Sequence, residues 1–182
     1  MSYRRWIFVA VCLFGIGMAF GLAMPAGIAK LLAEDLAALR ELGIILGPFQ
    51  ISTAIFIFLK NVSALLLSFI FSPILCLLPI LALTVNGWLL SFISVSVLQE
   101  ESLGFLLAGL LPHGILELPA LIIGEAAALS FGALAIVALV SKKRRNPLLP
   151  GLKRNLRYLT IACILLLPAA IIETYVTPLF LT

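Results

Sequence analysis

Residues 102–140 read SLGFLLAGLLPHGILELPALIIGEAAALSFGALAIVALV, a stretch in which only His113, Glu117 and Glu125 can ionise. A run of this length and apolarity predicts helix inside a bilayer. An ionisable group in such a helix costs about 2.5–3.5 kcal/mol on insertion scales and usually faces a bundle interior or a wet cavity. We therefore expect the function to lie near these three residues.

Two prolines and a glycine, Pro112, Gly114 and Pro119, stand in the same stretch. Proline removes a backbone donor and its ring clashes with the preceding turn. We expect regular helical hydrogen bonding to stop between about residues 111 and 119, with the freed backbone groups facing protein or water. Residues 102–118 are then predicted to form a re-entrant or interfacial half-helix rather than a full crossing.

The remainder of the chain is also strongly apolar. Of its 182 residues, 63% are hydrophobic and 11% are charged, and the mean hydropathy is +1.25, which leaves no polar face for a water-soluble surface. The apolar runs lack the strict alternation of barrel strands. We predict an all-α, polytopic helical membrane protein with residues 1–182 in a single integral-membrane domain. Its five transmembrane spans are predicted at residues 6–24, 52–71, 74–97, 120–140 and 158–176.

Basic residues set the predicted orientation. Arg4 and Arg5 precede the first span, and residues 141–157 carry seven basic residues and no acid, so the positive-inside rule assigns both segments to the cytoplasm. The predicted location is the cell membrane, with the N-terminus cytoplasmic and the C-terminus outside. Leucines and isoleucine at helical spacing in residues 26–46 predict an amphipathic helix on the outer interface. The net charge of +4 reflects this topology, so no nucleic-acid partner is expected.

Polar residues at comparable depth predict a site inside the bundle. The predicted polar network comprises Lys60, Asn61, Asn86, His113, Glu117, Glu125 and Glu173, with Gly87 as a structural residue beside Asn86. These side chains could converge on one outward-facing cavity that runs down to Lys60. Alternatively, Lys60 could form a buried ion pair with Glu117 or Glu125 that fixes the helix register. The asparagines could simply join helices, and His113 with Glu117 could cap a helix or staple a loop.

The residue inventory argues against enzymatic chemistry. A zinc metalloprotease normally presents two histidines around a glutamate, whereas this chain has one histidine, in the order His-x-x-x-Glu. No nucleophile motif and no glycine-rich phosphate loop is present in the sequence. We therefore expect no enzyme, no catalytic residue, no metal and no cofactor. Cys12, Cys76 and Cys163 are expected to pack as small apolar residues, and Gly17 with Gly21 forms a Gly-x-x-x-Gly spacing that suits close helix contact.

Several of these residues also form an ordered pattern. At Lys60-Asn61, Asn86-Gly87, Pro112-His113-Gly114, Glu117-Leu118-Pro119-Ala120 and Gly132, the chain resembles the stage II sporulation protein M family of small polytopic membrane proteins. The resemblance is strongest over residues 58–132. It implies a membrane scaffold or assembly factor, since sporulation members resemble scaffolds that recruit peptidoglycan-degrading partners. The alternative is a small-solute or ion transporter or channel that uses the polar cavity. Expected partners are the lipid bilayer, membrane or extracytoplasmic proteins, and a second copy of the chain.

Overall fold

The structure, a computed structural model, describes residues 2–24, 49–141 and 146–180. Within these ranges the regular elements are helices, and five of them are long and apolar enough to cross a membrane. The prediction of an all-α, multi-pass membrane protein is therefore confirmed. The amphipathic helix predicted at residues 26–46 lies outside the described residues. In chain order the helices are α1 (Tyr3–Leu22), α3 (Ile51–Phe71), α4 (Leu77–Glu100), α5 (Leu103–Val140), α6 (Leu148–Tyr175) and the short α7 (Thr177–Phe180).

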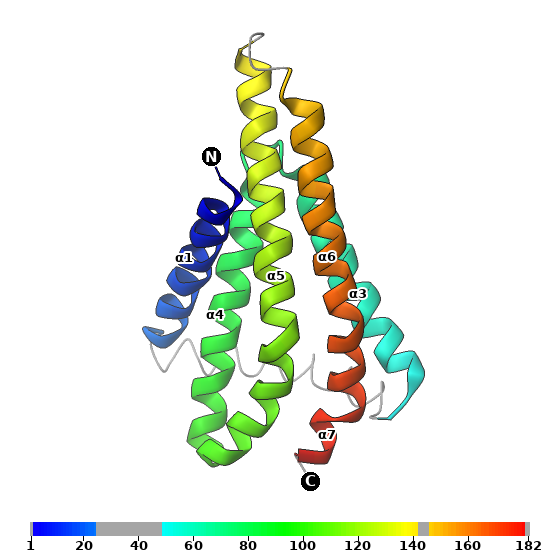
Figure 1. The fold of residues 1–182 in the computed structure, drawn as a ribbon. Helices are drawn as coiled ribbons and strands as arrows, with labels where there is room; N and C mark the ends of the chain where they lie inside the picture. The colour runs from blue at the N-terminus through cyan, green and yellow to red at the C-terminus, as the bar shows by residue number, and fades with distance from the viewer. Residues whose placement is uncertain (1, 25–48, 142–145, 181–182) are drawn as a thin grey trace.

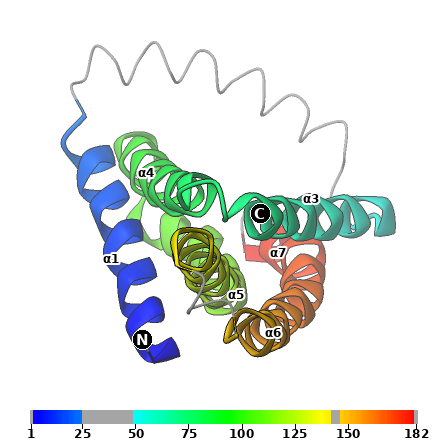
Figure 2. The same cartoon turned by 90° about the horizontal axis from the view of Figure 1, so that it is seen from above.

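Helix α5 occupies the centre of the bundle. Seen along the bundle, α1 and α4 lie on one side of it, and α3 and α6 lie on the other (Figure 2). The start of α1 and the connection between α5 and α6 lie towards the same end, whereas the C-terminus lies at the opposite end (Figure 1). Five crossings, the number found among the described residues, place the start of the first helix and the end of the last helix at opposite ends of the bundle.

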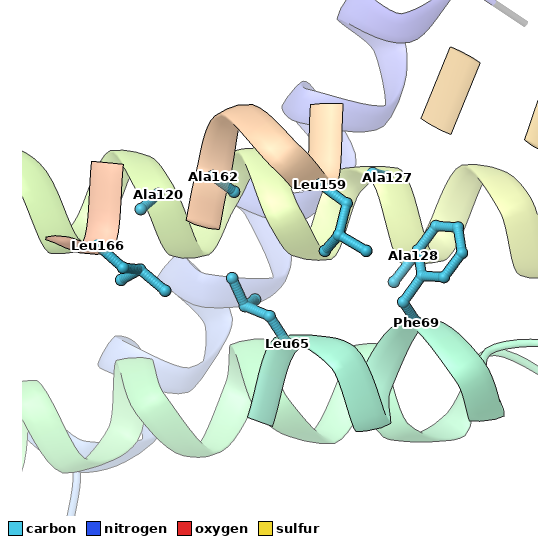
Figure 3. Packing of buried hydrophobic residues seen from close by; sticks show 8 residues of the cluster. All are labelled: Leu65, Phe69, Ala120, Ala127, Ala128, Leu159, Ala162 and Leu166. Atoms are coloured by element: carbon cyan, nitrogen blue, oxygen red, sulfur yellow. The ribbon is translucent and has the colours of Figure 1, made fainter. Parts of the chain in front are cut away.

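Small side chains let the neighbouring helices pack closely around α5. Ala120, Ala127 and Ala128 are fully buried and contact large residues from both flanking helices. Figure 3 shows this cluster, in which Leu65 and Phe69 come from α3. Its members from α6 are Leu159, Ala162 and Leu166. Because lipid supplies little hydrophobic driving force between helices, close van der Waals packing of this kind is the main source of cohesion in a membrane bundle.

Glycines bring α1 and α4 into backbone contact. A Cβ atom on Gly17 would lie 2.1 Å from the carbonyl oxygen of Thr84, and one on Gly87 would lie 2.1 Å from the carbonyl oxygen of Phe14. A Cβ on Gly21 would likewise meet the carbonyl oxygen of Trp88, at 2.6 Å. Side chains at these positions would force the helices apart, so the Gly-x-x-x-Gly spacing in the first span serves helix packing, as predicted.

The predicted break in helical hydrogen bonding between about residues 111 and 119 is wrong. Helix α5 continues from Leu103 to Val140, through Pro112, Gly114 and Pro119, and residues 103–113 form its first turns rather than a separate half-helix. A proline deletes one backbone donor, and neighbouring helices or local adjustments can satisfy the freed carbonyl, so a helix in a bundle can bend without stopping. Figure 1 shows the first turns of α5 inclined to the rest of the helix. The Ser102 hydroxyl caps the helix by accepting the backbone N–H of Phe105 at 3.2 Å.

Helix α6 begins well before its predicted span. Residues 141–157 are predicted to form a loop, but α6 starts at Leu148, so Lys153, Arg154 and Arg157 lie on its first turns. Charged residues are compatible with helix where the helix extends past the hydrocarbon, and lysine and arginine readily direct their charged ends towards the interface. Three of the seven basic residues in this segment therefore lie on helix, and the other four lie outside the described residues.

Candidate functional site

A cavity of about 310 Å³ lies among α3, α4, α5 and α6. Its polar lining consists of Lys60 and Asn61 from α3, Asn86 from α4, and Glu117 and Glu125 from α5. Five of the seven residues in the predicted polar network therefore line one cavity. The remaining lining is apolar and includes Leu65, Leu89, Leu118, Leu121 and Leu166. Whether a ligand binds in this cavity remains a prediction.

One polar contact joins α3 to α5 near the residues Glu117-Leu118-Pro119-Ala120. The side-chain amide of Asn61 donates a hydrogen bond of 2.9 Å to Oε1 of Glu117. The two residues are 56 positions apart in the sequence, and the contact is partly buried. A charge-assisted hydrogen bond in a low-dielectric environment is stronger than a neutral one, so this pair fixes the relative position of the two helices.

A second polar contact joins the same helices farther along the bundle. The Ser68 hydroxyl donates to Oε2 of Glu125. Both residues are buried, and only 1% of the Glu125 residue is exposed. Because Ser68 follows Asn61 by seven residues and Glu125 follows Glu117 by eight, the two contacts lie about 10–12 Å apart along nearly the same direction. Helices α3 and α5 are thus joined by two hydrogen bonds to carboxyl groups, which follow one another along the helix axes.

Lys60 lies in the cavity but forms no direct ion pair within it. Among the described side chains, no carboxylate oxygen lies within 4.0 Å of its ammonium group. The alternative prediction of an ion pair between Lys60 and Glu117 or Glu125 is therefore not met among the described side chains. Glu117 instead accepts a hydrogen bond from Asn61, and Glu125 accepts one from Ser68. Lys60 nonetheless adds one positive charge to a cavity that also contains two carboxyl groups.

Asn86 and Gly87 have different roles. The Asn86 amide donates to the carbonyl oxygen of Ala82 in its own helix, at 2.7 Å, and the residue lines the cavity. Gly87 faces α1, where its missing side chain admits the backbone of Phe14. The Asn-Gly pair thus combines a polar cavity residue with a helix-packing residue.

The other predicted residues lie away from the cavity lining or outside the described side chains. Glu173 lies near the end of α6 and does not line the cavity. The side chains of Pro112 and His113 lie outside the described part of the structure. Gly114 has space around it, since the nearest neighbour of an added Cβ is the Leu118 side chain at 3.8 Å. Pro119 is exposed on α5.

Sequence reasoning missed two polar residues. Ser68, the partner of Glu125, could have been found because it lies seven residues after Asn61 and therefore on the same face of α3. Asn155 lies in the segment that was predicted to be a loop, yet it is completely buried on α6. Within the described part of the chain, neither its side-chain oxygen nor its side-chain nitrogen has a hydrogen-bond partner.

The described residues do not include a group of three or more histidine, cysteine, aspartate or glutamate side chains that could hold a metal ion. The cavity combines an ammonium group, two amides and two carboxyl groups with an apolar remainder. Such a lining can bind and orient a small polar molecule, or it can bind ions.

Comparison with known proteins adds a family relationship. Residues 8–178 match the family described as stage II sporulation protein M. The chain is also similar to an uncharacterized protein of Methanocaldococcus jannaschii, with 27% identity over 173 residues, which cover 94% of this chain and 93% of that protein. No solved structure matches the chain.

Proposed function

Because this chain belongs to the stage II sporulation protein M family, we propose that it acts as a membrane scaffold or assembly factor that recruits partner proteins. The family is not a known enzyme family, and the proposal assigns no catalytic reaction to the chain. The five apolar helices make it a multi-pass membrane protein. We further propose that the N-terminus and the α5–α6 connection face the cytoplasm, since residues 141–157 contain seven basic residues and no acid.

The observation that carries the proposal is the projection of α5 and α6 beyond the rest of the bundle (Figure 1). Gly132 marks the level at which α3 ends before α4, because a Cβ on it would meet the carbonyl oxygen of Ser72, the residue after α3. Helix α5 continues for eight more residues, which is about 12 Å. Two helices that reach past their neighbours offer surfaces that the other described helices do not cover.

The projecting hairpin combines large apolar side chains with positive charge. Leu139 is 72% exposed and Leu149 is 61% exposed, while Lys153 and Arg154 are exposed on the following turn of α6. An apolar surface with charged residues at its border is typical of a protein-binding site. This combination supports a partner that presents an apolar surface flanked by acidic residues.

Photo-crosslinking from the hairpin tests the scaffold. A crosslinking amino acid at Leu149 is compared with one at Leu103. Leu103 is similarly exposed, but it is the first residue of α5 and lies at the other end of that helix. We expect a defined protein, identified by mass spectrometry, to crosslink from Leu149 and not from Leu103. Leu149→Glu should then reduce recovery of that protein in reciprocal purification, whereas Leu103→Glu should not. Identical products from both positions, or recovery that is insensitive to Leu149→Glu, would contradict the proposal.

The polar cavity favours a second candidate, a transporter or channel for a small solute or ion. An ammonium group and two carboxyl groups inside the span region are costly unless they serve packing or binding, and intramembrane ionisable residues often mark a substrate pathway. Reconstituted vesicles provide the test: flux of a small solute that is lost in Glu125→Gln, with the protein still folded, would support transport over a scaffold-only role.

A further inference from the structure

We propose that the cavity among α3, α4, α5 and α6 binds a small, elongated zwitterion, with its anionic end at Lys60 and its cationic end at Glu125. This inference rests on the second proposed function, in which the cavity accepts a solute, and does not depend on the scaffold. It goes further by naming the class of ligand. Three observations carry it: the separation of the two opposite charges, the composition of the lining between them, and the size of the cavity.

Lys60 and Glu125 line the same cavity without contacting one another. Among the described side chains, no carboxylate oxygen lies within 4.0 Å of the Lys60 ammonium group, and Glu125 accepts a hydrogen bond from the neutral hydroxyl of Ser68. Lys60 is exposed on α3, whereas Glu125 is buried on α5, so the two groups lie at different depths of the cavity. A cavity that holds them apart is complementary to a molecule that carries both opposite charges.

Helix geometry sets the length of this molecule. Lys60 and Ser68 are eight residues apart on α3, so their backbones are separated by about 12 Å along the helix axis. Ser68 contacts Glu125, which places the carboxyl group at the far end of this interval. The flexible side chain of Lys60 shortens the distance that a ligand must bridge. The ligand must still have its charged groups at opposite ends, which disfavours a compact α-amino acid.

The positions of the two charged residues, rather than the total charge, distinguish a zwitterion from singly charged ligands. A monoanion at Lys60 would add negative charge to a cavity that already contains Glu117 and Glu125. A monocation at Glu125 would offset one carboxyl group but would not contact Lys60. A zwitterion contacts both residues at once and adds no net charge to the cavity.

The lining between the two charges is apolar. Leu65 lies on α3 between Asn61 and Ser68, and Leu121 lies on α5 between Glu117 and Glu125; both line the cavity. The middle of the ligand is therefore expected to be hydrocarbon rather than hydroxylated. The cavity volume of about 310 Å³ falls at the small end of the range for ligand pockets, so the ligand is a small molecule rather than a lipid.

A series of ω-amino acids provides the direct test with the full-length protein in detergent. The probes are glycine, 4-aminobutyrate, 6-aminohexanoate and 8-aminooctanoate, and the controls with one charge are hexanoate and hexylammonium. Binding is measured by calorimetry and by the shift in thermal unfolding. We expect affinity to peak at an intermediate chain length. At the peak, the ω-amino acid should bind about tenfold more tightly than either analogue with one charge.

Two variants test which residue meets each end of the ligand. In Lys60→Met, 6-aminohexanoate should bind no better than hexylammonium, because the contact with the carboxylate is lost. In Glu125→Gln, it should bind no better than hexanoate. Lys153→Met removes a lysine that lies outside the cavity and should preserve the full preference. Lys60→Arg keeps the charge and should retain the preference even if Lys60→Met fails to fold.

The outcomes separate the ligand from the transport function. If no ω-amino acid binds more tightly than its singly charged analogues, the zwitterion proposal is overturned. A preference that persists in both Lys60→Met and Glu125→Gln would overturn it equally. Binding with the expected preference but without flux in vesicles would support the site and contradict transport. Flux of a solute of another charge class would support transport and contradict this ligand assignment.

Discussion

Asn61 on α3 donates a 2.9 Å hydrogen bond to Glu117 on α5, and this contact joins two of the segments on which the sequence resemblance was predicted. The asparagine is adjacent to Lys60, and the glutamate lies within the signature that follows Pro112. The bond therefore gives a physical reason for finding an asparagine in one helix together with a glutamate in another. It positions the ionisable residues of the cavity relative to one another.

Asn61→Leu should destabilise the protein by about 1–3 kcal/mol, because the partly buried carboxylate of Glu117 loses this donor. Unfolding in a mixed-detergent titration would measure the loss. Asn86→Leu is the matched control: the amide of Asn86 donates to Ala82 within its own helix, so its removal should have a smaller effect. Equal losses in the two variants would argue against a special role for the contact between helices.

Ser68→Ala should also be costly, again by about 1–3 kcal/mol, since it removes the described donor to the buried carboxyl group of Glu125. Combining it with Glu125→Leu should recover part of the loss, because both polar partners are then replaced by apolar groups. Ser94→Ala serves as the control, since Ser94 donates to Leu90 in its own helix at 2.6 Å. Additive effects of Ser68→Ala and Glu125→Leu would show that the two residues are not energetically coupled.

Much of this arrangement was predictable because membrane burial restricts both hydropathy and polar residues. The five crossings follow from apolar runs of span length, and the polar residues Lys60, Asn61, Asn86, Glu117 and Glu125 were grouped because isolated polar groups are unfavourable in lipid. Their hydrogen-bond partners depend on helix rotation and register, which the sequence pattern alone did not fix. Ser68 was missed for this reason, although its spacing from Asn61 contained the signal.

The prediction based on proline positions was wrong. Pro112 and Pro119 predicted an interruption, but α5 passes through both positions as one helix. The local preference against proline competes with packing along the rest of the helix, where residues such as Ala120, Ala126 and Ala127 are fully buried. Helix α5 therefore stays continuous in spite of its prolines. The boundary of α6 was misjudged for a related reason, since charge indicates depth in the membrane and does not by itself end a helix.

Gly17→Ala should weaken the packing of α1 on α4. A Cβ at this position would lie 2.1 Å from the carbonyl oxygen of Thr84, a separation that requires the backbones to move apart. Gly15→Ala is the control in the same helix, because nothing lies within 4 Å of a Cβ added there. Thermal unfolding should be earlier for Gly17→Ala, while Gly15→Ala should be neutral or more stable by up to about 1 kcal/mol. The opposite order would contradict the described contact between helices.

The proposed orientation predicts that a cysteine at Asn146 reacts with a membrane-impermeant reagent only from the cytoplasmic side. The seven basic residues in 141–157 are the physical reason, since they favour retention in the cytoplasm. A cysteine at Glu101, which lies between α4 and α5 at the other end of α5, should react only from outside. Labelling of intact cells and of inverted vesicles would test both positions after Cys12, Cys76 and Cys163 are replaced. Outside reactivity at Asn146 would reverse the assignment.

Asn155→Leu should raise the stability of the protein. Asn155 is completely buried on α6, and neither polar atom of its side chain has a hydrogen-bond partner among the described residues. Burying an unsatisfied amide costs about 1–3 kcal/mol on mutational scales, and leucine fills a similar space without that cost. The midpoint of thermal unfolding in detergent is the measurement, with Asn146→Leu as an exposed control at the start of the same region.

A marked loss of stability in Asn155→Leu would mean that the amide forms a hydrogen bond in the membrane-embedded protein. Unchanged stability combined with weaker partner crosslinking from Leu149 would instead assign Asn155 a part in shaping the projecting hairpin.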